Sequence, residues 1–162
     1  MNINNQITIV IVLYNSSNLI FDCLNSIPNN IEVKIVENSN NKTFQKNIQN
    51  KYQNVECILM GKNKGYAVAN NVGLKNVSSK YALVLNPDTI MGKNTIENFF
   101  TLAKKKEEFW LIGPANNQST FKNFESNNII EVNNLKGFAI FLNMKKFYQN
   151  FFDENFFLYF EE

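Results

Sequence analysis

The sequence has no histidine, and this absence excludes several kinds of catalytic site. A histidine general base, a Ser-His-Asp triad and a zinc site with histidine ligands are all ruled out. Only two cysteines occur, Cys23 and Cys57, and each lies in an apolar segment. We therefore expect two buried thiols in a reducing compartment, and no disulfide.

Long apolar runs and a basic stripe are also absent, and we expect no leader peptide. The first apolar run, Ile7 to Tyr14, is much shorter than the roughly 20 residues that a membrane-spanning helix needs. The start of the chain has no positive segment followed by a small-residue cleavage site, which predicts a cytoplasmic protein. The net charge is only +2 and the lysines are scattered, which argues against nucleic-acid binding.

The residues that are present indicate one soluble domain of alternating strands and helices. The chain has 162 residues, of which 44% are hydrophobic and 19% charged. β-Branched and apolar runs predict strands over 7–13, 33–36, 55–60 and 81–85. Helical spacing predicts helices over 19–27, 43–52, 66–74 and 95–105, the first capped within Asn15-Ser16-Ser17. This order predicts a doubly wound parallel sheet.

From about residue 110 the pattern changes to short strands in polar loops, predicted over 110–112, 129–132 and 138–142. We expect these strands to form a small mixed extension of the parallel sheet. Ligands of doubly wound sheets bind beyond the carboxyl ends of the strands. Polar residues follow all four predicted parallel strands at that edge: Tyr14-Asn15-Ser16, Glu37-Asn38-Ser39, Lys62-Asn63-Lys64-Gly65 and Asn86-Pro87-Asp88.

Asp88 is the most informative of these residues. Pro87 restricts the backbone on both sides of itself, so the carboxylate of Asp88 is aimed by a stiff turn. Mg²⁺ and Mn²⁺ bind one or two carboxylates together with substrate phosphates. On local sequence alone, an ordinary β-turn with Pro-Asp at its centre is the stronger interpretation.

Three further segments each admit a structural and a functional interpretation. Gly65 begins a helix whose first amides could bind an anion, or it is a glycine in an ordinary turn. Glu37 could accept hydrogen bonds from a base or ribose, or it is a solvated strand end. The closing "FDENFFLYFEE" could hold a general base among aromatic rings, or it is an amphipathic segment.

Taken in order, these segments resemble the motifs of the family 2 glycosyltransferases, most closely the rhamnosyltransferase-like branch. The family's "TYNS", "VDNxS", "NxGfaxaxNxG" and "LLNPDT" are similar to "VLYNSS", "VENSN", "NKGYAVANNVG" and "VLNPDT" here. A later "GxxxliRR" is matched loosely by "GFAIFLNMKKF", and "FDExFFlYfED" by "FDENFFLYFEE". The resemblance implies an α/β fold of the GT-A type, which is a Rossmann-like, nucleotide-diphospho-sugar transferase fold with a mostly parallel central sheet.

The resemblance also implies residue roles. Asp88 would bind a Mg²⁺ or Mn²⁺ ion that bridges the donor diphosphate, and Glu162, beside Glu161, would be the catalytic base. The residues expected to bind the donor nucleotide are Tyr14, Asn15, Glu37, Asn63, Gly65, Asn70, Asn86 and Asp88. Glu37 and Glu162 stand where the family has aspartate, so their reach differs by one methylene.

The implied domain is a single catalytic unit over 1–162, with a nucleotide-binding half to about 110 and an acceptor-side half over 111–162. Family members continue beyond their "ED" motif, so we expect this acceptor-side half to be incomplete and the chain to be truncated.

The implied reaction is an inverting transfer of a sugar from a nucleotide-diphosphate donor, dTDP-rhamnose or a UDP-hexose. The acceptor would be a saccharide or lipid-linked saccharide of a cell-surface polysaccharide. Three alternatives stay open: a nucleotide-binding fragment without turnover, a nucleotidylyltransferase, and a purely structural domain. Phe151, Phe152, Phe156 and Phe157 fit either a core or peripheral docking at the inner face of a membrane.

Overall fold

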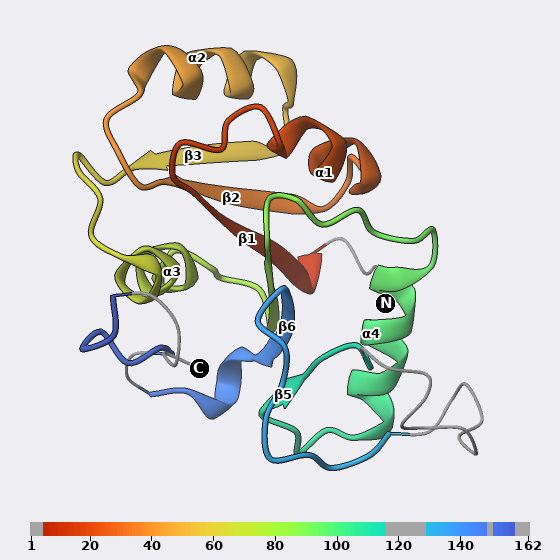
Figure 1. Ribbon diagram of the computed structural model, residues 1–162. Helices are drawn as coiled ribbons and strands as arrows, with labels where there is room; N and C mark the ends of the chain where they lie inside the picture. Colours follow the sequence, from red (N-terminus) through yellow and green to blue (C-terminus); the bar gives the residue numbers. More distant parts are fainter. Residues whose placement is uncertain (1–4, 116–128, 149–150, 158–162) are drawn as a thin grey trace.

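The computed structural model describes residues 5–115, 129–148 and 151–157. Within these ranges the chain alternates strands and helices before it ends in short irregular segments (Figure 1). The elements in chain order are β1 (Ile7–Leu13), α1 (Ile20–Ser26), β2 (Glu32–Glu37), α2 (Lys42–Lys51), β3 (Val55–Leu59), α3 (Tyr66–Lys75), β4 (Tyr81–Leu85), α4 (Thr95–Lys105), β5 (Leu111–Ile112), β6 (Ala139–Asn143) and the 3₁₀ turn η2 (Met144–Lys146).

One six-stranded sheet organises the described residues, with strand order β3-β2-β1-β4-β6-β5. β1, β2, β3 and β4 are parallel, whereas β6 pairs antiparallel with both β4 and β5. This arrangement confirms the expected parallel sheet with a small mixed extension. The order reverses between β1 and β4, and the carboxyl ends of strands at such a reversal are the usual ligand site of this architecture.

Helices cover both faces of the sheet, which is why its parallel strands are nearly continuously apolar. Alternate residues of β1, including Ile9 and Ile11, pack in one core with residues of α1, α2 and α4. Val10 points to the opposite face, where it packs with Ala67 and Leu74 of α3 and with Phe152. Figure 1 shows α3 and α4 on opposite sides of the sheet. The chain after β6 therefore joins the α3 layer.

Two local predictions are wrong. Residues 129–132 form no strand, and Glu131 and Val132 are exposed, because no neighbouring strand pairs with this stretch. α1 begins at Ile20, later than expected, and no side chain caps it. The residues expected to cap α1 instead form the turn that leaves β1, closed by a hydrogen bond from Leu19 N to Ser16 O (3.0 Å).

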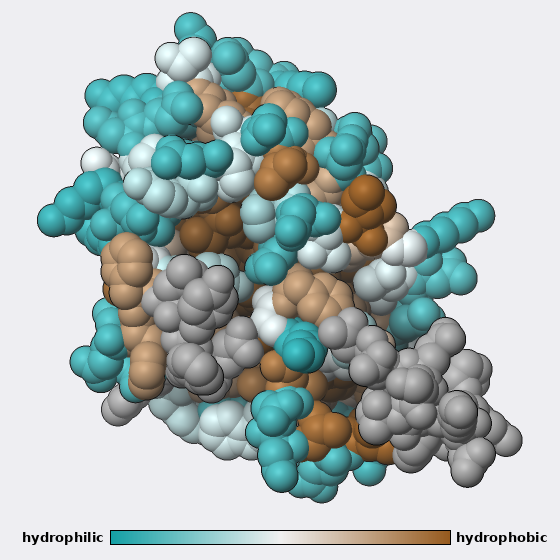
Figure 2. Space-filling model, in the orientation of Figure 1, coloured by the Kyte–Doolittle hydropathy of each residue, from teal (hydrophilic) through white to brown (hydrophobic). Residues whose placement is uncertain are grey.

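The surface differs between the two ends of the molecule. On the face in Figure 2, the surface over α2 is mostly hydrophilic, whereas apolar side chains appear lower down, over β5 and β6. Trp110 and Leu111 are exposed there, and the Trp110 ring packs edge-on against Phe147 with centroids 5.5 Å apart. In the described part of the chain, no helix is long and apolar enough to cross a membrane.

Candidate functional site: the carboxyl edge of the sheet

Backbone hydrogen bonds bring the ends of the first three parallel strands together. In the strand register Glu37 stands opposite both Leu13 of β1 and Leu59 of β3. Asn38 N donates to Leu13 O (2.7 Å), and Met60 N donates to Glu37 O (3.0 Å). The polar residues that follow these strands therefore lie at one edge.

Tyr14 and Asn15 follow β1 directly, next to the reversal in strand order. The Tyr14 side chain is 48% exposed, so a large ring stands in solvent at this edge. Asn15 has a left-handed backbone with φ 53°, and no other non-glycine residue in the described ranges has a positive φ. Asparagine tolerates this conformation better than most residues, and such backbone strain is concentrated at binding sites.

Glu37 is buried, with only 3% of its surface exposed, so it is not a solvated strand end. Its Oε1 accepts a hydrogen bond from the hydroxyl of Ser39, two residues further along. No cationic side chain among the described residues pairs with Glu37. A buried carboxylate that has one hydroxyl partner keeps acceptor capacity for a ligand.

Asn38 and Asn63 tie the loop before α3 to the end of β2. Asn38 Nδ2 donates to Asn63 Oδ1 (2.9 Å) and to Gly65 O (3.1 Å), while Asn38 Oδ1 accepts from Lys64 N (3.0 Å). Asn63 Oδ1 also accepts from Gly65 N (3.0 Å). Two asparagines thus fix the shape of this loop, and the predicted Asn63 and Gly65 lie within one hydrogen-bond network.

The start of α3 contacts a later segment of the same chain, at Phe157. Gly65 has φ 89°, and Tyr66 N donates to the carbonyl oxygen of Phe157 (2.9 Å). Asn70 is fully buried one turn later: its Nδ2 donates to Tyr66 O (3.1 Å), and its Oδ1 has no partner within the described residues. Asn70 therefore lies beneath the edge, and its predicted donor contact stays a prediction.

Asn86, Pro87 and Asp88 form a β-turn, closed by a hydrogen bond from Thr89 N to Asn86 O (3.1 Å). Asn86 N donates to Phe138 O (2.9 Å), which anchors the turn to the start of β6. Asp88 is exposed and has no cationic partner in the described ranges. The β-turn predicted from the local sequence is therefore present, and within the described ranges its carboxylate is exposed without a cationic partner.

Each of the two carboxylates at this edge lies near a buried thiol. Cys23 and Cys57 are free and buried, as expected from the sequence. Burial, and then the charge of Asp88, raises the pKa of Cys23 to about 12. Burial, and then the charge of Glu37, raises the pKa of Cys57 to about 12. Both thiols are therefore neutral and unreactive at physiological pH.

The metal expected from the sequence can be tested against these residues. Among the described residues, no three cysteine or acidic side chains converge into a cage for an ion. Mg²⁺ and Mn²⁺ do not need such a cage when substrate phosphates and water complete their coordination. One exposed carboxylate on a stiff turn fits that mode of binding, and Asp88 is the residue that would supply it.

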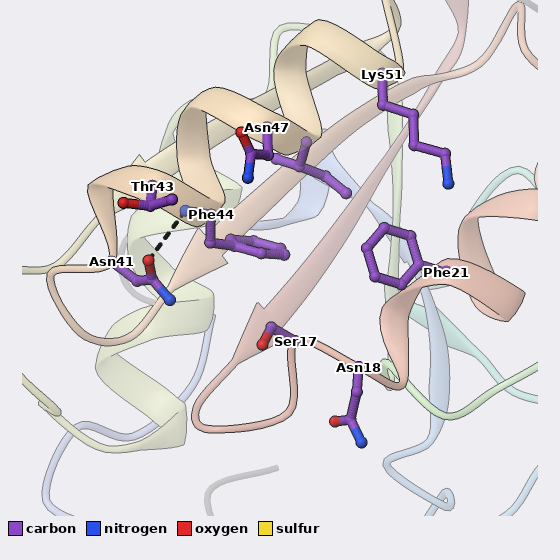
Figure 3. A pocket seen from close by; sticks show the side chains of 9 residues that line it. Ser17, Asn18, Phe21, Asn41, Thr43, Phe44, Asn47 and Lys51 are labelled. Atoms are coloured by element: carbon purple, nitrogen blue, oxygen red, sulfur yellow. Dashed lines mark hydrogen bonds between the residues drawn. The ribbon is translucent and has the colours of Figure 1, made fainter.

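A separate open pocket of about 530 Å³ lies between α1 and α2 (Figure 3). Phe21 and Phe44 face each other across it, and Asn41 caps α2 by accepting a hydrogen bond from Phe44 N (3.0 Å). Lys51 Nζ lies 4.6 Å from the centroid of the Phe21 ring. None of the predicted site residues lines this pocket, so it is a gap between two helices beside the edge.

The sequence interpretation missed Asn71, whose side-chain amide binds the segment that follows η2. In the motif "NxGfaxaxNxG" the second asparagine is the ninth residue, which is Asn71 in "NKGYAVANNVG", and this count could have identified it. Of the closing aromatic residues, Phe152 is buried, whereas Phe156 and Phe157 are exposed. The predicted catalytic residues Glu161 and Glu162 lie outside the described residues.

Comparison with known proteins identifies the family of this architecture. The model of Glycosyl transferase family 2 matches residues 8–161. No curated protein matches the sequence.

Solved glycosyltransferase structures share the fold. S. aureus TarS 1-349 is 21% identical with a TM-score of 0.67, and the match covers 92% of this chain and 50% of that one. Its complex with UDP is 19% identical, with a TM-score of 0.69 and coverages of 94% and 51%. The mannosyltransferase PcManGT from Pyrobaculum calidifontis, in complex with GDP-Man and Mn²⁺, is 13% identical, with a TM-score of 0.68 and coverages of 85% and 44%.

These similarities confirm the GT-A fold that the motifs implied. The chain spans about half the length of the structures that it matches.

Proposed function

Because the chain belongs to glycosyl transferase family 2, we propose that it binds a nucleotide-diphosphate sugar and transfers the sugar with inversion. The position and exposure of Asp88 carry this proposal. It is an exposed carboxylate without a cationic partner, on a turn stiffened by Pro87, at the edge where parallel sheets bind ligands. The structural neighbours in complex with UDP and with GDP-Man and Mn²⁺ support a donor site of this kind.

In the proposed site, Asp88 would hold Mg²⁺ or Mn²⁺, and the ion would supply positive charge against the donor diphosphate. Asn86, beside it, would contact the donor. Tyr14, which is exposed, and Asn15, which has a left-handed backbone, would line the nucleotide pocket beside the reversal in strand order. Glu37 would accept hydrogen bonds from the base or ribose. The hydrogen bond from the Ser39 hydroxyl would orient the Glu37 carboxylate for that contact.

At the start of α3, Asn63, Gly65 and Asn70 would bind the donor nucleotide, and the hydrogen bond from Gly65 N to Asn63 Oδ1 supports this part of the proposal. Glu162, with Glu161 beside it, would take the proton from the acceptor hydroxyl as its oxygen attacks the anomeric carbon. The proposed donor is dTDP-rhamnose or a UDP-hexose. The proposed acceptor is a saccharide or lipid-linked saccharide of a cell-surface polysaccharide.

Calorimetric titration of UDP and dTDP, with and without Mn²⁺, tests this proposal. We expect Mn²⁺ to tighten nucleotide binding, and Asp88→Asn to weaken binding in Mn²⁺ by at least about tenfold, or about 1.4 kcal/mol. The matched control is Glu97→Gln, which removes an exposed carboxylate charge from α4 and should leave the affinity unchanged.

Three outcomes distinguish the alternatives. Equal affinities of Asp88→Asn and the wild type in Mn²⁺ would contradict the metal role of Asp88. Binding without sugar transfer would favour a nucleotide-binding fragment. Absence of nucleotide binding by the folded chain would contradict the proposed function.

A further inference from the structure

The segment 151–157 is attached to α3 mainly by the side chain of Asn71, which is fully buried. Asn71 Oδ1 accepts hydrogen bonds from the backbone N of Phe151 and of Phe152, each 3.0 Å long. Asn71 Nδ2 donates to Phe152 O (2.9 Å) and to Glu154 Oε1 (2.8 Å). The two acceptor and two donor positions of the amide are therefore all used on one segment, some 80 residues away in sequence.

A second attachment lies at the start of the same helix. Tyr66 N donates to Phe157 O (2.9 Å), so the first turn of α3 holds the other end of the segment. A Cβ atom at Gly65 would lie 2.8 Å from Phe157 O and 3.2 Å from Phe157 Cα. Glycine is therefore required here both by φ 89° and by the close approach of the segment.

Tyr66 also connects this segment to the turn that carries Asp88. Its ring packs edge-on against Phe152, with centroids 6.1 Å apart and an interplanar angle of 83°. Its hydroxyl lies 3.4 Å from Asn86 Oδ1, a long hydrogen bond to the first residue of the turn. One side chain thus contacts both the segment and the proposed metal-binding turn.

We propose that Asn71 is a positioning residue, which fixes the segment 151–157 on α3 without touching the donor. This inference rests on the proposed function, because it gives the fixed segment a role in sugar transfer. In the sequence the proposed catalytic residues Glu161 and Glu162 follow Phe157 by four and five residues, so the held segment leads directly into them. Asn71 should therefore affect the transfer step and leave donor binding unaffected.

The test compares Asn71→Leu with Asn76→Leu by amide hydrogen exchange and by kinetics. Leucine has nearly the shape of asparagine but makes none of the four hydrogen bonds. Asn76 is the matched control, because it follows the same helix directly and is exposed. Within the described residues its side chain bonds only through Nδ2 to Val72 O (2.8 Å). In Asn71→Leu we expect the amides of Phe151 and Phe152 to exchange at least about tenfold faster, with the β4 amides unchanged.

The kinetic readout separates positioning from general destabilisation. In Asn71→Leu, kcat for sugar transfer should fall at least about tenfold, while the donor KM and nucleotide Kd stay within about twofold. Unchanged exchange at Phe151 and Phe152, or a donor KM that rises as much as kcat falls, would overturn the proposal. Asn76→Leu should match the wild type in every measurement.

A second pair of variants applies if Asn71→Leu does not fold. Gly61 and Gly65 both have positive φ, but a Cβ atom at Gly61 has nothing within 4 Å. Gly65→Ala should therefore speed exchange of the Tyr66 amide, which donates to Phe157 O, and Gly61→Ala should not; equal effects of the two would contradict the attachment.

The exchange measurements need neither nucleotide nor acceptor. A wild-type chain that binds no nucleotide, or transfers no sugar, would count against the proposed function. The exchange rates would still decide whether Asn71 holds the segment.

Discussion

The carboxylates near the amino ends of the parallel strands form ion pairs, whereas those at the carboxyl ends do not, within the described residues. Near the amino ends of β2 and β3, Lys34 Nζ lies 2.7 Å from Glu32 Oε1 and 2.5 Å from Glu56 Oε2. Thr8 Oγ1 adds a hydrogen bond to Glu32 Oε2 (2.9 Å). At the carboxyl edge, Asp88 and Glu37 have no cationic partner among the described residues.

The difference separates a structural cluster from the proposed donor site. Burial acts to lower the pKa of Lys34, but its hydrogen bonds to Glu32 and Glu56 outweigh burial and raise that pKa. The charges near the amino ends of the strands are therefore paired with one another, Lys34 with Glu32 and Glu56. The carboxylates of the opposite edge have no such partner among the described residues, which is the arrangement that the proposed donor site requires.

The largest expected effect on stability comes from disturbing the packing of α3 against β1 and β2. A Cβ atom at Gly73 would lie 2.4 Å from Val10 Cγ1 and 3.0 Å from Val36 Cγ2, in the middle of the sheet. Gly73→Ala should therefore lower the free energy of unfolding by about 1–3 kcal/mol, net of the helix propensity that alanine adds. Denaturant unfolding measures this change. Gly92→Ala is the control, because its nearest neighbour would be Thr95 Oγ1 at an ordinary 3.5 Å; equal stability of the two variants would contradict the close packing.

A smaller effect should appear when only the amino-terminal cluster is broken. Lys34→Met keeps the buried stem but removes the charge, leaving Glu32 and Glu56 to repel each other. We expect a loss of about 1 kcal/mol in the free energy of unfolding, well below the cost for a fully buried pair, because both glutamates are partly exposed. Nucleotide affinity should stay unchanged, and a parallel fall in affinity would break the distinction between the two ends.

The thiols beneath the carboxyl edge should have the smallest effect on stability near neutral pH and should act only at alkaline pH. Their pKa values rise from 9.0 to about 12 on folding, so between these pH values the unfolded chain loses protons that the folded chain keeps. Stability should therefore be unaffected by the thiols below pH 9 and should decrease as pH rises from 9 towards 12. Thermal unfolding of the wild type and of Cys57→Ala over this range measures the effect. The variant should show a shallower decrease, and identical slopes would mean that Cys57 does not contribute.

Elements with an uninterrupted apolar pattern were predictable to the residue. β4 and α4 coincide with their predicted ranges, because a fully buried strand and a strongly amphipathic helix leave few alternative registers. The turn after β1 and the stretch 129–132 were predicted wrongly. Their polar and isolated apolar residues suit several local structures, and tertiary pairing decides among them.

By itself, the sequence determined the order of strands and helices, the two buried thiols and the set of polar residues that follow the strands. It did so through apolar periodicity and motif spacing, which are local properties of the chain. Only the tertiary structure decided that Glu37 is buried. It also decided that Lys34 pairs with Glu32 and Glu56, and that Asn71 holds a segment some 80 residues away. Those facts depend on contacts between residues distant in sequence, and no local pattern specifies which distant partner will fill the hydrogen bonds of a buried amide.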